Sequence, residues 1–285
     1  MIPSPLFYLI LAAIPLALIG CGKTEIQRAM ETLEKGEEIA RIRTSIAEDL
    51  KKHTEGVEAL SSRVAPLFEG EEVPSAARLS AELKNVRRPP EVIQAFVFSP
   101  VDRLFVLSAE GVVLGSDENK PAEGERNIIS ESPGLRSALD QGSSGHLVGA
   151  LGEGDGAVPY LFFHAPIKQD GETVAHAIAG YALWKEGRKI TLQMRREFGE
   201  QIREGAIIWA FAYHGDESFP LPDAAGEITA EIPNAEARRA ALEKSPEQAI
   251  VQGKIVMRDI GMAIISVPEV DPDFGLVYFR GVPPR

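Results

Sequence analysis

Apolar residues between positions 24 and 65 recur at steps of three and four, which is the spacing of one face of an α-helix. They are Ile26, Met30, Leu33, Ile39, Ile42, Ile46, Leu50, Val57, Leu60 and Val64. The step from Leu33 to Ile39 breaks the register beside Gly36, so the pattern predicts a long helix with a bend at that point. At roughly 1.5 Å per residue, such a helix is about 60 Å long.

The opposite face of this predicted helix is charged, and it carries Glu34, Lys35, Glu37, Glu38, Arg41 and Arg43. A helix with one apolar face lifts a domain off a membrane, packs along two stacked domains, or pairs with a second copy of itself. The pattern leaves these three alternatives open. His53 lies on the apolar stripe, and we interpret it as a residue of the helix surface or of a dimer seam.

Short runs of β-branched and aromatic residues, bounded by Gly, Asp and Pro, predict strands in the rest of the chain. The predicted strands are 104–108, 112–116, 146–151, 158–168 and 173–184, and then 206–213, 228–232, 249–256, 262–267 and 276–279. Short helices are predicted at 76–85, 134–141 and 234–244, and a connecting helix at 185–204. Tight turns at 109–111 and 169–172 join neighbouring strands, which indicates antiparallel pairing.

The order of these elements repeats, with strands, a short helix and three more strands at 96–184 and again at 206–282. We therefore expect the α+β class, with a long N-terminal helix followed by two units built on antiparallel sheets. The expected division is a leader at 1–20, a helical stalk with short helices at 21–95, a first unit at 96–184, a connecting helix at 185–205 and a second unit at 206–285.

The first twenty residues carry no charged side chain, and their apolar run ends at Cys21, the only cysteine of the chain. Such a stretch is typical of an export signal. Leu18-Ile19-Gly20-Cys21 resembles the lipobox of bacterial lipoproteins. The resemblance implies a diacylglyceryl group on the Cys21 thiol, cleavage before Cys21 and acylation of the new amino terminus. An uncleaved membrane helix is the alternative, because about 20 apolar residues span a bilayer.

Composition narrows the partners of the exported part. The chain is 25% charged and 44% hydrophobic, as globular domains are, and its net charge of −12 argues against nucleic acid or anionic lipid as a partner. With no cysteine besides Cys21, an internal disulfide and a thiolate metal site are both excluded. Gly22, in the place where an Asp would resemble an inner-membrane retention signal, favours the outer membrane, with the protein facing the periplasm.

Three segments resemble the Cache-type extracytoplasmic sensors. They are the hairpin at 104–116, the short helix Pro133-Gly134-Leu135-Arg136-Ser137-Ala138-Leu139, and the closing hairpin from Tyr160-Leu161-Phe162-Phe163-His164-Ala165-Pro166-Ile167 through Asp170-Gly171 to Ala179-Gly180-Tyr181-Ala182-Leu183. The resemblance implies one or two PAS-like units, each a five-stranded antiparallel sheet with helices on one face. Amino-acid-binding members carry an acidic residue on the closing strand, and residues 179–182 offer none.

In a Cache fold, the ligand would lie between the sheet and the short helix of the first unit. Tyr160, Phe162 and His164 occupy every second position of a strand and so share one of its faces. Arg136 lies on the short helix, and Tyr181 lies on the closing strand. Arg and Tyr donors of this kind bind a small anion or carboxylate. The alternative is that both tyrosines are ordinary strand residues, that His164 is a satisfied polar residue and that Arg136 is solvated.

Other segments suggest chemistry only superficially. Residues 269–275 resemble a calcium loop with its glycine one place late, and residues 152–156 lack the spacing of a phosphate loop, so we interpret both as connections. The sequence has no nucleophile elbow, no His-Glu-x-x-His pair and no cysteine nucleophile. We therefore predict no catalytic residue, no metal site and no cofactor.

The expected function is that of a membrane-anchored periplasmic lipoprotein whose Cache-like domain binds or senses a small organic molecule. The alternative is a non-catalytic envelope scaffold that binds another envelope protein and has no small ligand. A hydrolytic enzyme is the third reading and the least favoured. A homodimer through the N-terminal helix stays open as a further partnership.

Overall fold

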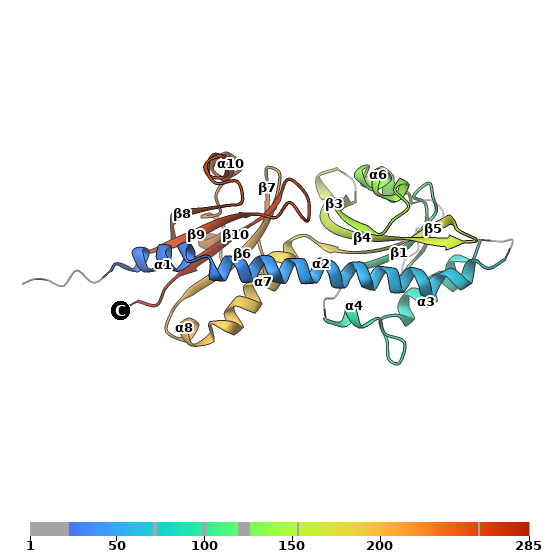
Figure 1. Cartoon of the computed structure of the whole chain (residues 1–285), viewed down its shortest axis with the longest axis horizontal. Helices are drawn as coiled ribbons and strands as arrows, with labels where there is room; N and C mark the ends of the chain where they lie inside the picture. The colour runs from blue at the N-terminus through green and yellow to red at the C-terminus, as the bar shows by residue number, and fades with distance from the viewer. Residues whose placement is uncertain are drawn as a thin grey trace, which may run out of the picture.

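The computed structural model describes residues 23–70, 73–98, 101–118, 126–152, 154–255 and 257–284. Figure 1 shows an elongated molecule in which one long helix runs beneath two sheets that lie end to end. The predicted leader and Cys21 lie outside the described residues. No helix in the described part of the chain is long and apolar enough to cross a membrane.

Two helices form the N-terminal segment, α1 (Glu25–Glu34) and α2 (Glu37–Val64). Helix α1 begins with a capping box, in which the Thr24 side chain accepts from the Gln27 backbone while the Gln27 side chain accepts from the Thr24 backbone. Gly36 joins the helices with a φ of 74°, a left-handed conformation that glycine adopts without strain. The predicted bend is therefore confirmed.

Helix α2 buries its apolar face against both sheets at once. Its buried side chains belong to one continuous core with residues of both sheets, among them Ile39, Ile42, Ile46, Leu50, Val57, Leu60 and Val64. Of the three arrangements left open by the sequence, the described residues show packing along two sheets. The interpretation of His53 was wrong, because its ring is fully buried and stacks on Phe163 at 4.6 Å between centroids.

The first sheet has the strand order β2-β1-β5-β4-β3, with every pairing antiparallel. Its strands are β1 (Arg103–Leu107), β2 (Val113–Ser116), β3 (Gly145–Leu151), β4 (Val158–Gln169) and β5 (Glu172–Ala182). Around it lie α3 (Ala76–Asn85), α4 (Gln94–Phe98), α5 (Ile128–Glu131), α6 (Gly134–Asp140) and the short 3-10 helices η1 (Ala65–Phe68) and η2 (Gly154–Gly156). Helix α6 covers the face opposite α2, so the sheet lies between two helical layers (Figure 1).

The second sheet has the order β7-β6-β10-β9-β8, which repeats the topology of the first. Its strands are β6 (Ile207–His214), β7 (Glu217–Phe219), β8 (Gln248–Ile255), β9 (Arg258–Ser266) and β10 (Phe274–Gly281). The helices of this half are α7 (Trp184–Glu197), α8 (Gly199–Arg203), α9 (Gly226–Thr229) and α10 (Ala235–Lys244). The expected α+β class with two antiparallel sheets is confirmed.

Two element predictions were wrong. The segment 228–232 is the end of α9 and a turn, not a strand. Its two isoleucines are four residues apart, so they point to the same side and pack against the buried residues of the second sheet. The strand that belongs there in the topology is β7, whose three residues are too short to show a periodicity. The connecting helix is likewise two helices, because Phe198 leaves the helical conformation with φ −98° and ψ 32°.

A buried ion pair joins α2 to the last strand of the chain. Glu38, which the sequence pattern placed on the charged face, is 5% exposed, and Arg280 on β10 is 2% exposed. The Arg280 Nε donates to Glu38 Oε1 at 3.1 Å, and the Tyr278 hydroxyl donates to Glu38 Oε2 at 2.7 Å. The guanidinium also lies 5.1 Å from the Phe198 ring centroid.

Replacing Glu38 with Ala should lower the free energy of unfolding by about 3–5 kcal/mol, because it leaves the Arg280 charge buried without a counter-ion. Glu37→Ala is the matched control, since Glu37 is the exposed neighbour, and it should change stability by less than about 0.5 kcal/mol. Urea unfolding of both variants measures the difference. Equal stabilities of the two variants would contradict a structural role for the pair.

Candidate functional site

The four residues predicted to bind a ligand do not form one site. Tyr160 and His164 share the β4 face that lies under α6, as their alternation predicted. Tyr181 pairs with Leu161 across the sheet and therefore points to the opposite face, toward α2. Arg136 is exposed and donates to the Ala109 carbonyl at 3.1 Å. Tyr181 therefore lies on the other face of the sheet from Tyr160 and His164, and the prediction that it joins them in one site was wrong.

The space between the first sheet and α6 is occupied by side chains. Its buried residues are Phe105, Leu107, Val113, Ile128, Leu135, Leu139, Leu151, Tyr160, Phe162, Ile178 and Ala182. A methyl group added at Gly149 would lie 2.0 Å from the Ser132 Oγ, and one added at Gly180 would lie 2.8 Å from the Phe162 ring. The layers are therefore in direct contact, where the resemblance placed a ligand.

Two histidines are buried in this same layer. His176 is opposite Pro166 and so shares the face of His164, and the two rings are 3% and 2% exposed. The Nδ1 atom of each has no hydrogen-bond partner among the described residues. Burial lowers the pKa of His164 to about 4 and also lowers the pKa of His176, so both rings are neutral at pH 7.

A groove of about 710 Å³ lies on the other side of the molecule, between α2 and α7. Helix α2 supplies Asp49 and Lys52 to its walls, and α7 supplies Glu186, Arg188 and Arg196. The sequence pattern gave no sign of this groove, because its two helices are far apart in the chain and meet only through the packing of α2 on both sheets.

A buried carboxylate forms the base of the α2–α7 groove. Glu186 is 1% exposed, and its Oε2 accepts from the Tyr181 hydroxyl at 2.7 Å. Lys189 lies 3.5 Å from the same oxygen and also pairs with Asp49 on α2. Burial, together with the nearby Glu186 carboxylate, raises the pKa of Tyr181 well above its ordinary value, so Tyr181 stays a donor.

The second oxygen of Glu186 has no hydrogen-bond partner in the described part of the chain. The molecule contains a filled version of the same arrangement, because Tyr278 on the last strand of the second sheet donates to Glu38 at the same 2.7 Å. There the other carboxylate oxygen is taken by Arg280. By comparison, Glu186 Oε1 is an acceptor that lacks its donor, which is costly in a buried position.

The rim of the groove is cationic. Arg188 and Arg196 form no ion pair with any described residue, whereas Lys52 lies 3.7 Å from Glu48. Arg188 lies 6.0 Å from the Trp184 ring centroid. The groove therefore offers a buried acceptor at its base and free guanidinium groups at its edge, which suits a small molecule that has a donor at one end and an anionic or acceptor group at the other.

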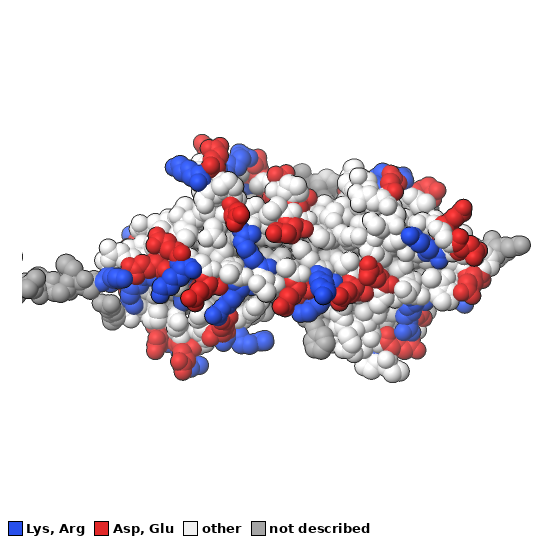
Figure 2. Space-filling model, viewed as in Figure 1, with Lys and Arg blue, Asp and Glu red and all other residues white. Residues whose placement is uncertain are grey.

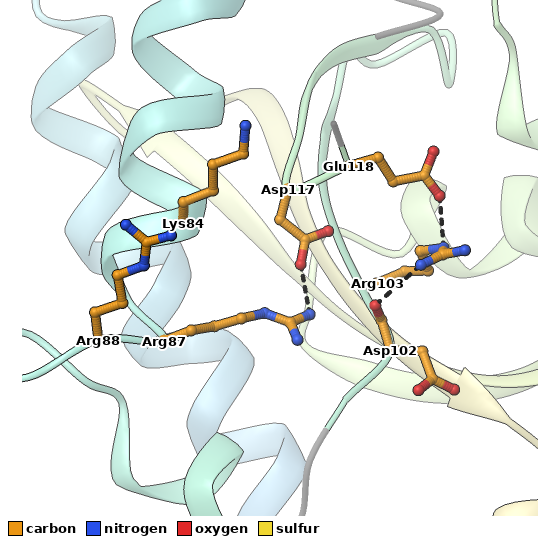
Figure 3. A pocket seen from close by; sticks show the side chains of 7 residues that line it. All are labelled: Lys84, Arg87, Arg88, Asp102, Arg103, Asp117 and Glu118. Atoms are coloured by element: carbon orange, nitrogen blue, oxygen red, sulfur yellow. Dashed lines mark hydrogen bonds and ion pairs between the residues drawn. The ribbon is translucent and has the colours of Figure 1, made fainter. Parts of the chain in front are cut away.

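A second hollow, of about 560 Å³, lies at the edge of the first sheet, where the end of α3 meets β1 and β2 (Figure 3). Its charges largely satisfy one another. Arg87 pairs with Asp117 at 2.5 Å, and Arg103 pairs with Glu118 at 2.5 Å. Burial raises the pKa of Asp117, although Arg87 and the Leu104 N–H oppose the shift. We interpret this hollow as an ion-pair network that holds α3 to the sheet.

No group of three or more His, Cys, Asp or Glu side chains among the described residues is placed to hold a metal ion. The segment that resembled a calcium loop connects β9 to β10, and Asp271 in it accepts from the Asp273 N–H at 3.0 Å. On the face shown in Figure 2, acidic and basic side chains are interspersed along α2.

No protein-family model matches this sequence, and no curated protein does either. Solved structures are similar to it. The ligand-binding domain of the Campylobacter jejuni chemoreceptor Tlp3 in complex with L-valine aligns with a TM-score of 0.56 and 10% identity, over 92% of this chain and 98% of that one. The ligand-binding domain of the Pseudomonas aeruginosa chemoreceptor PctC in complex with GABA aligns with a TM-score of 0.51 and 15% identity, over 87% and 98%.

The ligand-binding domain of the Pseudomonas aeruginosa chemoreceptor PctB in complex with L-Gln is also similar, with a TM-score of 0.51 and 12% identity over 86% of this chain and 88% of that one. Together with the long helix and the two five-stranded sheets, these similarities show the fold. The chain has the double Cache-like α+β fold of chemoreceptor sensor domains.

Acidification should destabilise the protein through His164. Its folded-state pKa of about 4 is below the ordinary 6.5, so the unfolded chain binds more protons between these values and stability falls as pH falls from 6.5 to 4. In the wild type this one group makes the free energy of unfolding fall by up to about 1.4 kcal/mol per pH unit, and His164→Gln should lack that contribution to the slope. Urea unfolding across the window measures it, and parallel curves for wild type and variant would contradict the assignment.

Proposed function

We propose that this protein is a lipid-anchored extracytoplasmic sensor that binds a small polar molecule in the α2–α7 groove. The anchor is the acylated Cys21, and the location is the bacterial envelope, at the outer membrane facing the periplasm. The charge-free leader that ends at the only cysteine supports this placement. The fold supports the sensing role, since the similar chains are ligand-binding domains of chemoreceptors.

The observation that carries the ligand proposal is the buried, half-satisfied carboxylate of Glu186. A ligand ammonium, amide or hydroxyl group that donates to Oε1 completes the arrangement that Arg280 completes at Glu38. The guanidinium groups of Arg188 and Arg196 then take the acceptor end of the ligand. Small amino acids and related compounds, such as the L-valine and GABA in complex with the similar domains, have both ends.

The position of the groove couples ligand binding to the second sheet, because α7 contacts both α2 and β6. Besides Lys189 and Asp49, the Ser45 hydroxyl donates to Gln193 at 2.6 Å across the α2–α7 contact. On its other side α7 packs on β6, where Thr191 accepts from the Ala210 N–H at 2.8 Å. A ligand that changes how α7 lies on α2 therefore acts directly on β6 and, through it, on the second sheet.

The second candidate function is a scaffold without a small ligand. The observation that favours it is the filled layer under α6, which leaves side chains in contact where a Cache ligand was expected. In that case the fold presents a surface to another envelope protein, and the α2–α7 groove is only a structural joint.

Radiolabelled palmitate should label the wild-type protein in growing bacteria and should not label Cys21→Ala, because the thiol is the site of acylation. Equal labelling of both proteins would rule out the lipoprotein assignment.

A panel of amino acids and small zwitterions should contain a compound that raises the melting temperature of wild type, by about 2–4 °C for each kcal/mol of binding free energy. Glu186→Gln should lose most of the shift, because a neutral amide binds a cationic donor less strongly. The control is Glu200→Gln, since the Glu200 side chain is 88% exposed on α8, and it should keep the shift. Capture of an envelope protein, with no shift from any compound, would favour the scaffold.

A further inference from the structure

Four segments of the chain meet at one end of the molecule. Arg258, at the start of β9, donates to the carbonyls of Gly205 and Val282, and its guanidinium lies 3.5 Å from Glu25 in the first turn of α1. Arg28 on α1 donates to the Pro283 carbonyl at 2.9 Å. The start of α1, the end of the chain and the tip of the β8–β9 hairpin are therefore fastened together, at the left of Figure 1.

The hairpin tip reaches as far as the start of α1. Helix α1 lies along β9, since a methyl group added at Gly261 would lie 2.9 Å from Leu33 and 3.5 Å from the Ala29 carbonyl. From there β9 runs back toward its tip while α1 runs back toward Glu25, and the two meet again at Arg258. Met257, which precedes Arg258, is therefore level with the first turn of α1 or beyond it.

The proposed anchor holds this end close to the bilayer. Cys21 and Glu25 are separated by four peptide units, which span at most about 14 Å when extended. An uncleaved membrane helix would enter α1 at the same place. Under either form of attachment, the hairpin is close enough to the point of attachment for Met257 to reach the lipid.

Met257 is the most exposed large apolar side chain of the described residues, at 84%. The others are Val73 at 66%, Leu192 at 53%, Val97 at 49% and Val158 at 41%. A methionine side chain is flexible and adapts to irregular apolar surroundings. Its exposure near the start of α1, where the proposed anchor attaches, is compatible with a contact with lipid.

We propose that the β8–β9 hairpin contacts the bilayer through Met257, whose side chain inserts between the phospholipid headgroups. This goes beyond the proposed function and rests on its anchor. A single side chain binds a membrane weakly, but the anchor makes the second contact intramolecular and so effective. The net charge of −12 points to a zwitterionic lipid surface, not an anionic one. The contact fixes the orientation of the molecule, with the first sheet away from the membrane.

The test measures oxidation of Met257 by dilute hydrogen peroxide, with mass spectrometry of the peptides. Residues 21–285 are coupled through the single thiol of Cys21 to a maleimide lipid in phosphatidylethanolamine–phosphatidylcholine vesicles. Tethering should slow sulfoxide formation at Met257 by at least about fivefold relative to the free protein, because lipid excludes the oxidant. The control is Val73→Met, whose introduced methionine should oxidise equally fast in both states.

Equal oxidation of Met257 in the free and tethered protein overturns the proposal, and so does equal protection of Met257 and of the methionine introduced by Val73→Met. Protection in the free protein at high concentration, which indicates a second copy of the chain, overturns it as well. Met257→Trp gives an independent readout, since brominated lipids should quench its added fluorescence. The chemical tether does not depend on acylation in the cell, so palmitate labelling tests the proposed function separately.

Discussion

The buried ion pair between Glu38 and Arg280 fixes the position of α2, and the rest of the molecule is assembled on that helix. A carboxylate and a guanidinium in an apolar layer are stable only together and only with their hydrogen bonds complete. Here Tyr278 and Gln201 supply the remaining contacts. A one-residue shift of α2 along the sheets would break the pair and bury two unmatched charges, so the register is set far more strictly than apolar packing alone requires.

The same kind of contact recurs where the two sheets meet, and there it is incomplete. Tyr181 and Glu186 form the counterpart of Tyr278 and Glu38, but no guanidinium reaches the second oxygen. The Tyr278–Glu38 pair thus has all its hydrogen bonds and holds the structure together. The Tyr181–Glu186 pair retains an unused acceptor at the base of the α2–α7 groove. A fold of two similar units allows this division, because one joint can hold the helix while the other stays able to change.

Periodicity predicted the elements better than it predicted their surroundings. The α2 stripe and the hairpins were visible because steps of three and four, or of two, repeat over many residues, whereas β7 is three residues long and shows no period. Alternation showed that Tyr160 and His164 share a face, but the face of Tyr181 depends on which residue of β4 it pairs with. The burial of Glu38 depends on partners far away in the chain, and Glu186 lies under a groove that only the packing of α2 beside α7 creates, so no local pattern contains that information.

The helix that both sheets share, α2, lies near the start of the described residues, and the strand that completes its covering, β10, is the last of the described elements. Glu38 and Arg280 are 242 positions apart. Until β10 is available, one part of the α2 stripe has no sheet to lie against, and contacts of such long separation form slowly. The export proposed above requires an unfolded precursor, and a core that cannot close until β10 has been made suits that proposal.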